Sequence, residues 1–327
     1  MGGLSPDARA ALERIVAAVT MKMPGQARIE SPTGPLDVPV AGPAGPAGGL
    51  AEALYGRFYI VPCPVPQQAE AGFLDRLRAA NPVSQRFEDG WTVAVVEPGA
   101  VLLADPRGRQ RRASPAEVVP VAGALAPGGP VRLAVARETV TAPNGHYVIF
   151  GRPIRDARSG RQARFYWNVA PAGAAGLLTA LGSALERRRI PFQAKVPVAP
   201  ALYGRADCGV LYLNFEDIEA SLDIVADIRA AAQETLRDET PLFARRLAPG
   251  LAFAESPPTN ESFGMQRCRL VAEGLVSACG RGATEPEARI EAICERFLHY
   301  GLDPGRLERN PSSLYPYRLE TIESRAA

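Results

Sequence analysis

The order of strand-like and helix-like segments constrains the fold of this chain more than any other feature of its sequence. The second half holds three strand-like runs and four helix-like segments, at residues 164–169, 191–196 and 205–214, and at 174–189, 217–237, 263–279 and 285–300. These segments do not alternate regularly along the chain. A doubly wound parallel sheet requires that alternation, so the order predicts an α+β fold.

The first half is typical of helices followed by a small sheet. Helix-like segments near the start and at about residues 48–60 and 67–80 precede strand-like runs at 91–97, 101–104, 131–138 and 146–152. We therefore predict an N-terminal helix and sheet region at residues 1–150, which we expect to contribute peptide binding. A mixed α+β domain is predicted at residues 151–305, followed by a C-terminal tail at residues 306–327.

Charge and cysteine content narrow the functional classes. A net charge of +2 over 327 residues gives no reason to expect nucleic acid or an anionic membrane as partner. The five cysteines are scattered without a Cys-x-x-Cys pair, which favours free thiols in a reducing compartment over disulfides or zinc. With no signal peptide and no apolar run of membrane-spanning length, we expect a cytoplasmic protein.

Lysine is rare in this chain. Lys22 and Lys195 are its two lysines among 37 cationic side chains, and the rest are arginines. Arginine stays protonated in a protein, whereas an ammonium group can lose its proton when it is buried or crowded by cations. A lysine kept in the apolar run Phe192-Gln-Ala-Lys195-Val-Pro197 therefore suggests chemistry that needs a neutral amine.

Three strand-like segments each carry a polar face, because alternate residues of a strand share one side. The three faces contain Arg164, Tyr166 and Asn168; Gln193 and Lys195; and Tyr203, Arg205 and Asp207. They mix cations with amide, phenol and carboxylate groups and so could converge on one site. The alternative is the commoner one, in which such faces are solvated sides of an exposed sheet.

A fourth polar element is the start of the helix predicted at residues 263–279. Ser262 can cap it, Gly264 allows close backbone approach, and its first N–H groups together with Arg267 could bind phosphate. The alternative is a plain cap with a surface arginine. Glu255, upstream, is either a buried partner for an arginine or a loop acid.

The histidines and the known enzyme motifs give little indication of any other kind of catalytic site. His146, at the start of a strand-like run, is a candidate acid, although a lone histidine there is more often structural. His299 and His146 lie far apart without a Cys/His cluster, so no transition-metal site is expected. Nucleophile-elbow, phosphate-loop and dinucleotide motifs are absent, which argues against the corresponding enzyme classes.

An ordered series of motifs resembles the Hop type III effector family, whose relatives serve as lyase components of class V lanthipeptide and thioamitide synthetases. The resemblance covers about residues 50–300 and is most specific at residues 164–275. It rests on Arg164-Phe-Tyr-Trp-Asn168, Pro191-Phe-Gln-Ala-Lys195, Tyr203-Gly-Arg205-Ala-Asp207, Pro241-Leu-Phe243, Ala248-Pro-Gly250, Ala254-Glu255-Ser-Pro257 and Glu261-Ser262-Phe-Gly264 with Arg267.

The resemblance implies a fold similar to phosphothreonine lyases and a metal-independent, cofactor-free elimination of phosphate from phosphoserine or phosphothreonine in a precursor peptide. Lys195 would match the base that takes the α-proton, and Arg205 and Arg267 would bind the phosphate. Either His146 or Tyr203 would be the acid, or a protonated carboxyl. A separate kinase-like protein would phosphorylate the peptide, and a cyclase step would add cysteine thiols.

Two alternatives remain open at this point. One is a non-catalytic subunit that binds phosphopeptide for a partner kinase or cyclase, and the other is an effector lyase that acts on a phosphorylated host protein. The binding subunit would tolerate Lys195→Arg, whereas a lyase that needs a neutral amine would not.

Overall fold

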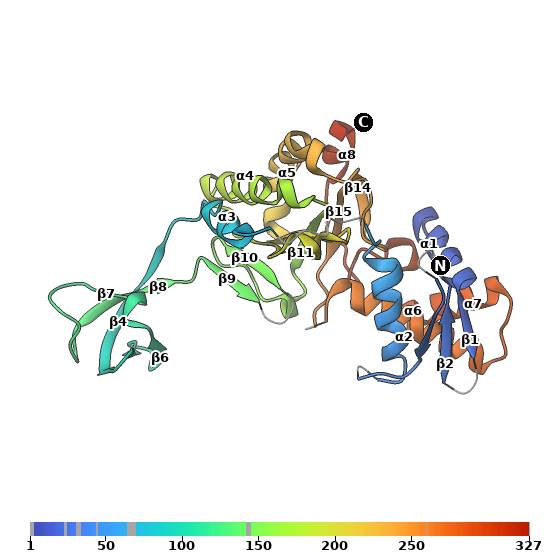
Figure 1. The fold of residues 1–327 in the computed structure, drawn as a ribbon, viewed down its shortest axis with the longest axis horizontal. Helices are drawn as coiled ribbons and strands as arrows, with labels where there is room; N and C mark the ends of the chain where they lie inside the picture. Colours follow the sequence, from blue (N-terminus) through green and yellow to red (C-terminus); the bar gives the residue numbers. More distant parts are fainter. Residues whose placement is uncertain are drawn as a thin grey trace. The chain divides into compact units, whose positions relative to one another are not determined.

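The computed structural model describes residues 3–22, 25–30, 34–43, 45–63, 70–141, 145–259 and 261–326. The chain forms two compact units, of which unit 1 contains Met1–Asn81 and Val140–Ala327, and unit 2 contains Pro82–Thr139. Helices and strands are mixed in sequence, and no parallel doubly wound sheet is formed among the described residues. The predicted α+β class is confirmed (Figure 1).

Among the described residues, the α-helices all belong to unit 1. They are α1 (Pro6–Ala18), α2 (Gly48–Leu54), α3 (Phe73–Ala79), α4 (Ala174–Arg187), α5 (Ile218–Ala232), α6 (Phe263–Gly280), α7 (Pro286–His299) and α8 (Glu320–Ala326), with a π-helical turn η1 (Tyr55–Tyr59) directly after α2. Ser5 and Ser262 cap α1 and α6 as predicted, accepting hydrogen bonds from the backbone N–H groups of Ala8 and Met265, each at 3.2 Å.

The described residues form three sheets. The first is β1 (Val19–Lys22), β2 (Gln26–Ile29) and β3 (Leu36–Pro39). The second has seven strands in the order β14 (Arg245–Ala248), β15 (Leu251–Glu255), β11 (Gln162–Trp167), β13 (Gly209–Asn214), β12 (Gln193–Pro197), β10 (His146–Phe150) and β9 (Glu138–Thr141). The third lies in unit 2 and has the order β6 (Gln110–Ala113), β5 (Ala100–Ala104), β4 (Arg86–Glu97), β8 (Pro130–Val135) and β7 (Val118–Pro120).

The seven-stranded sheet carries the polar residues singled out from the sequence. Its strands from β14 to β10 pair antiparallel, so directly paired residues share a face. Two neighbouring rows cross one face: Val148, Lys195, Val210, Tyr166 and Ala252 in one, and Phe150, Gln193, Tyr212, Arg164 and Ala254 in the other. We call this the polar face.

The opposite face of this sheet is covered by helices. Trp167 and Gly209 pair there, and a Cβ atom on Gly209 would lie 3.1 Å from the Leu177 side chain of α4. Helices α4 and α5 pack against each other on this side (Figure 1). The C-terminal segment also packs there, because the Tyr317 ring lies 4.8 Å from the Phe253 ring of β15.

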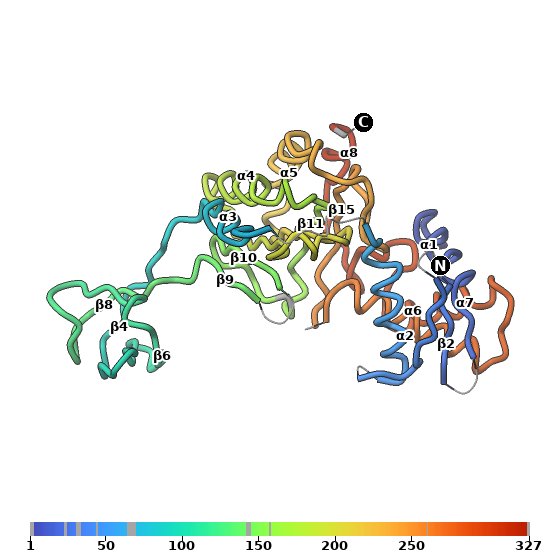
Figure 2. The backbone as a smooth tube through the Cα atoms, viewed as in Figure 1, coloured from blue at the N-terminus to red at the C-terminus, as the bar shows by residue number. Residues whose placement is uncertain are grey.

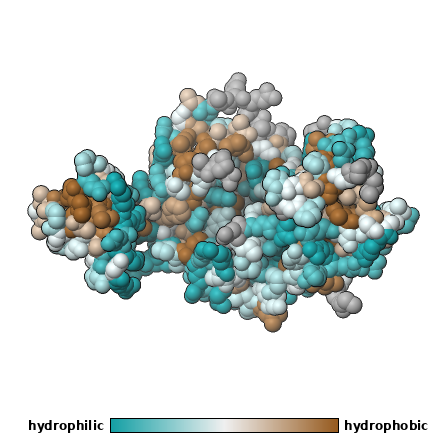
Figure 3. All heavy atoms as spheres, turned by 90° about the horizontal axis from the view of Figure 1, so that it is seen from below, coloured by the Kyte–Doolittle hydropathy of each residue, from teal (hydrophilic) through white to brown (hydrophobic). Residues whose placement is uncertain are grey.

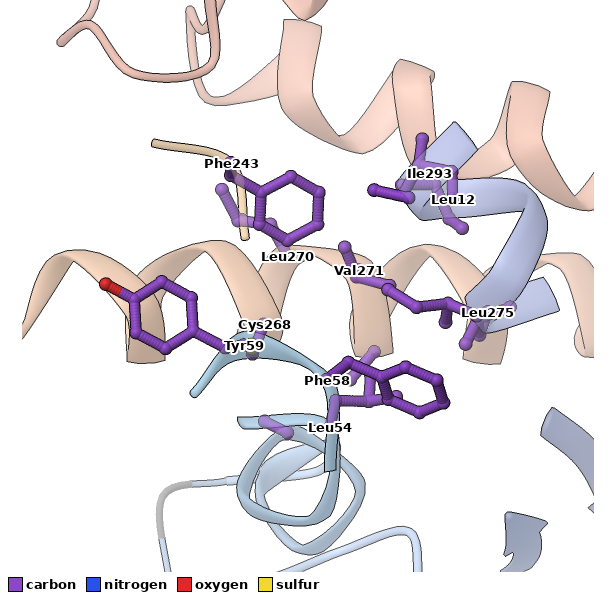
Figure 4. Close-up of a cluster of buried hydrophobic side chains, with 14 of the residues drawn as sticks. Leu12, Leu54, Phe58, Tyr59, Phe243, Cys268, Leu270, Val271, Leu275 and Ile293 are labelled. Atoms are coloured by element: carbon purple, nitrogen blue, oxygen red, sulfur yellow. The ribbon is translucent and has the colours of Figure 1, made fainter. Parts of the chain in front are cut away.

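Helix α6 covers part of the polar face and joins it to the N-terminal elements. Tyr166 and Val210 belong to the same buried cluster as Phe263 and Cys268 of α6. Figure 4 shows this cluster, with Phe58 and Leu54 on one side of α6 and Ile293 of α7 on the other. Gly264 is needed for the approach of η1, since a Cβ atom there would lie 2.3 Å from the Tyr59 ring.

The chain before residue 82 therefore packs with the second half rather than forming a region with residues 82–150. The N-terminal helix α1 packs against α7 (Figure 2). Arg289 of α7 donates hydrogen bonds to the carbonyl oxygens of Val16 (2.8 Å) and Val19 (2.6 Å). This grouping differs from the division at residue 150 that the sequence suggested. Local composition does not reveal it, because the contacts join residues more than 250 positions apart.

Unit 2 is a small antiparallel sheet with its own core. Trp91, Val93, Leu103 and Leu133 are among its buried residues. Its surface also carries exposed apolar side chains, namely Phe87, Val95, Val96 and Val121, and Figure 3 shows hydrophobic residues on this unit.

Most predicted helices and strands are present in the structure, with differences at their ends. The first helix ends at Ala18 instead of continuing to Met21, because Val19 starts β1. The strand predicted at residues 205–214 begins only at Gly209, because Pro200–Tyr203 forms a 3₁₀ turn and residues 204–208 are irregular. Within the described residues, no helix is long and apolar enough to span a membrane. Pro143 and Asn144 of a predicted turn, and Asn260 before the Ser262 cap, lie outside the described residues.

Candidate functional site

A cavity of about 450 Å³ lies over the polar face, a volume in the usual range for ligand sites. Three elements enclose it: the strands of the sheet, the π-helical turn η1 and the first turn of α6. Its lining residues are Tyr55, Tyr59, His146, Arg164, Tyr166, Lys195, Arg205, Asp207, Val210, Tyr212, Glu261, Ser262, Gly264 and Met265. Six residues predicted as site residues thus line one cavity: His146, Arg164, Lys195, Arg205, Asp207 and Ser262.

Lys195 and Arg164 reach this cavity from strands on either side of β13. Both contact Tyr212: the Lys195 Nζ atom lies 5.8 Å and the Arg164 Cζ atom 5.2 Å from its ring centroid. Burial acts to raise the pKa of the Tyr212 phenol, but the charges of Lys195 and Arg164 and a hydrogen bond from Lys195 outweigh it, so this pKa is lowered. The paired cations therefore stabilise negative charge at this point.

Arg164 is held in place without being neutralised. Its Nε atom donates to the Ser256 hydroxyl at 3.1 Å, and Nη1 lies 3.5 Å from the Tyr166 hydroxyl. Within the described residues, neither Arg164 nor Lys195 forms an ion pair with a carboxylate. Arg164 is 8% exposed. A solvated strand face, the alternative left open by the sequence, is therefore excluded for this residue.

Arg205 has a different environment. It forms a two-pronged ion pair with Asp207, with Nη2 2.8 Å from Oδ2, and the same Nη2 donates to the Tyr55 hydroxyl at 2.7 Å. Asp207 therefore offsets much of the Arg205 charge and fixes the guanidinium. The other carboxylate lining the cavity, Glu261, is bound bidentately by Arg269 at 3.0 Å, so it too has a cationic partner.

The start of α6 adds a further electropositive group. Ser262 caps the helix, and the N–H groups of its first turn have no partner within the helix. The helix dipole places partial positive charge at this end, which is the arrangement that binds phosphate at helix N-termini. Gly264 brings this turn close to η1, where Tyr59 lies against α6 with its hydroxyl pointing away from the hydrophobic cluster (Figure 4).

His146 lies at the cavity wall opposite Pro197, on the same sheet face as Lys195. His146 is partly exposed. It lies on β10 two residues before Val148, the residue that pairs with Lys195. His146 therefore borders the cavity, as do Lys195 and Arg164.

Four predicted site residues do not line the cavity. Two of them are fully buried, Arg267 on α6 and Tyr203 in the 3₁₀ turn that follows β12. Arg267 donates to the carbonyl oxygens of Leu307 (2.9 Å) and Arg309 (2.8 Å), and burial lowers its pKa to about 10. Tyr203 donates its hydroxyl to the Pro197 carbonyl at 3.0 Å, and burial raises its pKa well above the ordinary value. Both contacts stabilise the fold.

The other two have structural partners as well. Glu255 points to the opposite side of the sheet from Arg164, because Arg164 pairs with the preceding residue, Ala254. Its carboxylate accepts hydrogen bonds from the C-terminal segment. Asn168 lies beyond the end of β11, where its side-chain amide donates to the carbonyl oxygen of Glu239 at 3.0 Å.

Sequence reasoning missed three of the four tyrosines that line the cavity, since of these four it placed only Tyr166 on a polar face. Tyr55 and Tyr59 stack at 5.0 Å between ring centroids. Tyr212 lies on the same face as Lys195, and a correct register for residues 209–214 would have identified it. The tyrosines of η1 reach the site only through long-range packing on α6, which no local pattern predicts.

The chemistry of the cavity favours an anionic ligand next to an amine. Two cations without carboxylate partners and a helix N-terminus face the same space. In the described part of the chain, no three His, Cys, Asp or Glu side chains are grouped so that they could hold a metal ion.

Comparison with known proteins gives a family match. A model of the HopA1 effector protein family matches residues 139–309, more than half of the chain. Two solved effector structures from Pseudomonas syringae are similar. That from pathovar tomato strain DC3000 has 19% identity, coverage of 80% of this chain and 90% of that chain, and a TM-score of 0.48. That from pathovar syringae strain 61 has 15% identity, coverage of 94% and 98%, and a TM-score of 0.49. No curated protein matches the chain.

Proposed function

The chain belongs to the HopA1 effector protein family, and from this premise we propose that it is a phosphoserine and phosphothreonine lyase. Its substrate would be a phosphorylated ribosomal precursor peptide, and its products inorganic phosphate and dehydroalanine or dehydrobutyrine. A kinase-like partner would supply the phosphate group, and a cyclase would consume the dehydro residue. The observation that carries the proposal is the cavity in which Lys195 lies beside Arg164 and the N-terminus of α6.

The elimination needs a base at the α-carbon. Lys195 first releases its ammonium proton to solvent. The neutral amine then takes the α-proton, and the electron pair of the broken C–H bond forms the new Cα=Cβ bond. Because the α-proton of a peptide is weakly acidic, a positioned base contributes about 10²–10⁴-fold to such a step. Tyr212 contacts both the amine and Arg164, and it keeps the amine at the sheet face.

The leaving group needs stabilisation of negative charge. As the Cβ–O bond breaks, its electron pair leaves with the phosphate. Arg164, Arg205 and the N–H groups at the start of α6 provide fixed positive charge around it. His146 donates the proton that completes the phosphate. No step requires a metal or cofactor.

Substitution of Lys195 tests this assignment. A peptide with one phosphoserine is incubated with each protein, and the dehydroalanine product is measured by mass spectrometry. Lys195→Ala and Lys195→Arg should each reduce turnover by about 10²–10⁴-fold, since arginine cannot serve as a base at neutral pH. Lys22→Arg is the matched control, because Lys22 pairs with Asp37 on the surface and should retain full activity.

A non-catalytic phosphopeptide-binding subunit is the alternative. It would use the same cations, so Lys195→Arg would bind phosphopeptide as well as the wild type, and neither protein would release phosphate. A wild-type rate for Lys195→Ala would overturn the role of Lys195 in a lyase.

A further inference from the structure

A second cavity adjoins the proposed reaction cavity. It has a volume of about 510 Å³, and four of its lining residues, Arg164, Tyr212, Glu261 and Ser262, also line the first cavity. The shared wall means that a ligand can extend from one cavity to the other past Arg164 and Tyr212. The second cavity is therefore a continuation of the site rather than a separate one.

Gln193 is the group in the second cavity that is available for a ligand. It lies two residues before Lys195 on β12, on the same face, and pairs with Tyr212 across the sheet. Its side chain is half-buried, and its amide forms no hydrogen bond with any other described residue. Gln162, by contrast, is engaged: its amide donates to the Arg155 carbonyl at 3.0 Å and accepts from Ser256 at 3.0 Å.

The chemistry of Gln193 matches a peptide main chain. Its carbonyl oxygen and NH₂ group can accept from and donate to the N–H and C=O groups of a peptide, irrespective of sequence. The backbone of β12 cannot take this role, because β10 and β13 already use its hydrogen-bonding groups on both edges. A bound peptide must therefore cross the face of the sheet, where side chains contact it.

The spacing between Gln193 and Lys195 on β12 determines which residue of the substrate Gln193 contacts. Two residues along a strand span about 7 Å, and an extended substrate has the same rise per residue. We propose that the substrate peptide runs extended from the first cavity into the second, and that Gln193 hydrogen-bonds the main chain two residues from the phosphorylated residue. This rests on the proposed function and makes Gln193 a positioning residue that selects phosphopeptides over single phosphoamino acids.

The test compares two ligands. One is a phosphoserine peptide with four residues on either side, and the other is phosphoserine capped by acetyl and methylamide groups. Gln193→Ala should raise the KM for the peptide about tenfold, equivalent to about 1.4 kcal/mol, with kcat within about twofold. The same variant should leave kcat/KM for the capped residue unchanged. Gln110→Ala, which removes an exposed glutamine of unit 2, is the matched control and should change neither.

Truncation of the peptide locates the contact. Removing the residues beyond the phosphoserine on one side should abolish the difference between wild type and Gln193→Ala, while removal on the other side should not. An equal loss for both ligands, or no loss for either, would overturn the inference.

A binding measurement separates this inference from the proposed function. In the Lys195→Ala background, calorimetry should show about tenfold weaker peptide binding when Gln193→Ala is added, and no change for the capped residue. If the wild type releases no phosphate but this difference is found, the lyase assignment fails and the peptide site stands. If elimination occurs and the difference is missing, only the peptide site fails.

Discussion

Glu255 offers a sharp test of whether a residue singled out by its motif acts in the fold or in the site. The Glu255 carboxylate is fully buried and accepts three hydrogen bonds, from the Asn310 N–H (2.7 Å), the Ser313 hydroxyl (2.5 Å) and the Tyr317 hydroxyl (3.0 Å). These contacts attach the C-terminal segment to β15. Glu255→Ala removes both acceptor oxygens and with them all three hydrogen bonds, so it should destabilise the protein while the reaction cavity stays intact.

The magnitude follows from the donors that lose a partner. The Ser313 side chain is only partly buried and can turn to water, whereas the Tyr317 hydroxyl is buried and the Asn310 N–H is fixed by the backbone. Two donors left unsatisfied, at about 1–3 kcal/mol each, predict a loss of about 4 kcal/mol. Glu255→Gln keeps an oxygen for Asn310, and hydroxyls can accept from its NH₂ group, so it should cost only about 1–2 kcal/mol.

Urea unfolding of the wild type and both variants measures these losses. Glu234→Ala is the matched control, because Glu234 is an exposed carboxylate and its removal should change stability by less than about 0.5 kcal/mol. The structural assignment would be refuted if Glu255→Ala unfolded within about 1 kcal/mol of the wild type yet lost lyase activity.

Three further predictions follow from single contacts. Arg267→Met should lower the free energy of unfolding by about 2–4 kcal/mol, because two buried carbonyl oxygens lose their donor. The kcat of the folded protein should stay within about twofold. Loss of kcat with unchanged stability would instead make Arg267 a site residue. Gly264→Ala should destabilise the protein by about 1–3 kcal/mol in thermal unfolding, since the added Cβ would overlap the Tyr59 ring. Gly176→Ala, on α4 with open space around it, should stabilise the protein by about 0.5–1 kcal/mol. Equal effects of the two substitutions would contradict the close approach of η1 to α6. Absorbance titration should detect the Tyr212 phenol ionising below the ordinary pKa of about 10, and Lys195→Met should raise that pKa. Identical titration curves for the two proteins would contradict the contact.

Strand alternation was the most informative pattern in the sequence. It placed Gln193 with Lys195 and Arg164 with Tyr166 on common faces, and the register of β11, β12 and β13 brings these faces together. It failed at Tyr203, because a 3₁₀ turn precedes β13 and breaks the alternation. Arg205 lines the cavity from the irregular segment instead.

Contacts that join distant residues account for what could not be predicted. Arg267 follows the cap of α6, where the sequence predicted a phosphate ligand, but the carbonyl groups that accept its hydrogen bonds lie 40 and 42 residues further along the chain. Tyr55 and Tyr59 reach the cavity because Gly264 leaves room for η1 against α6. Such placements depend on tertiary packing, and neither propensity nor periodicity encodes them locally.

The central claim is that the cavity around Lys195 eliminates phosphate from a phosphopeptide. Its most direct test is the mass of a phosphoserine peptide after incubation with the wild-type protein and a metal chelator. Elimination predicts loss of one phosphoric acid from the peptide and a product that adds an external thiol. Loss of the phosphoryl group with serine regenerated would mean hydrolysis, and an unchanged mass would mean binding alone; either result would contradict the lyase assignment.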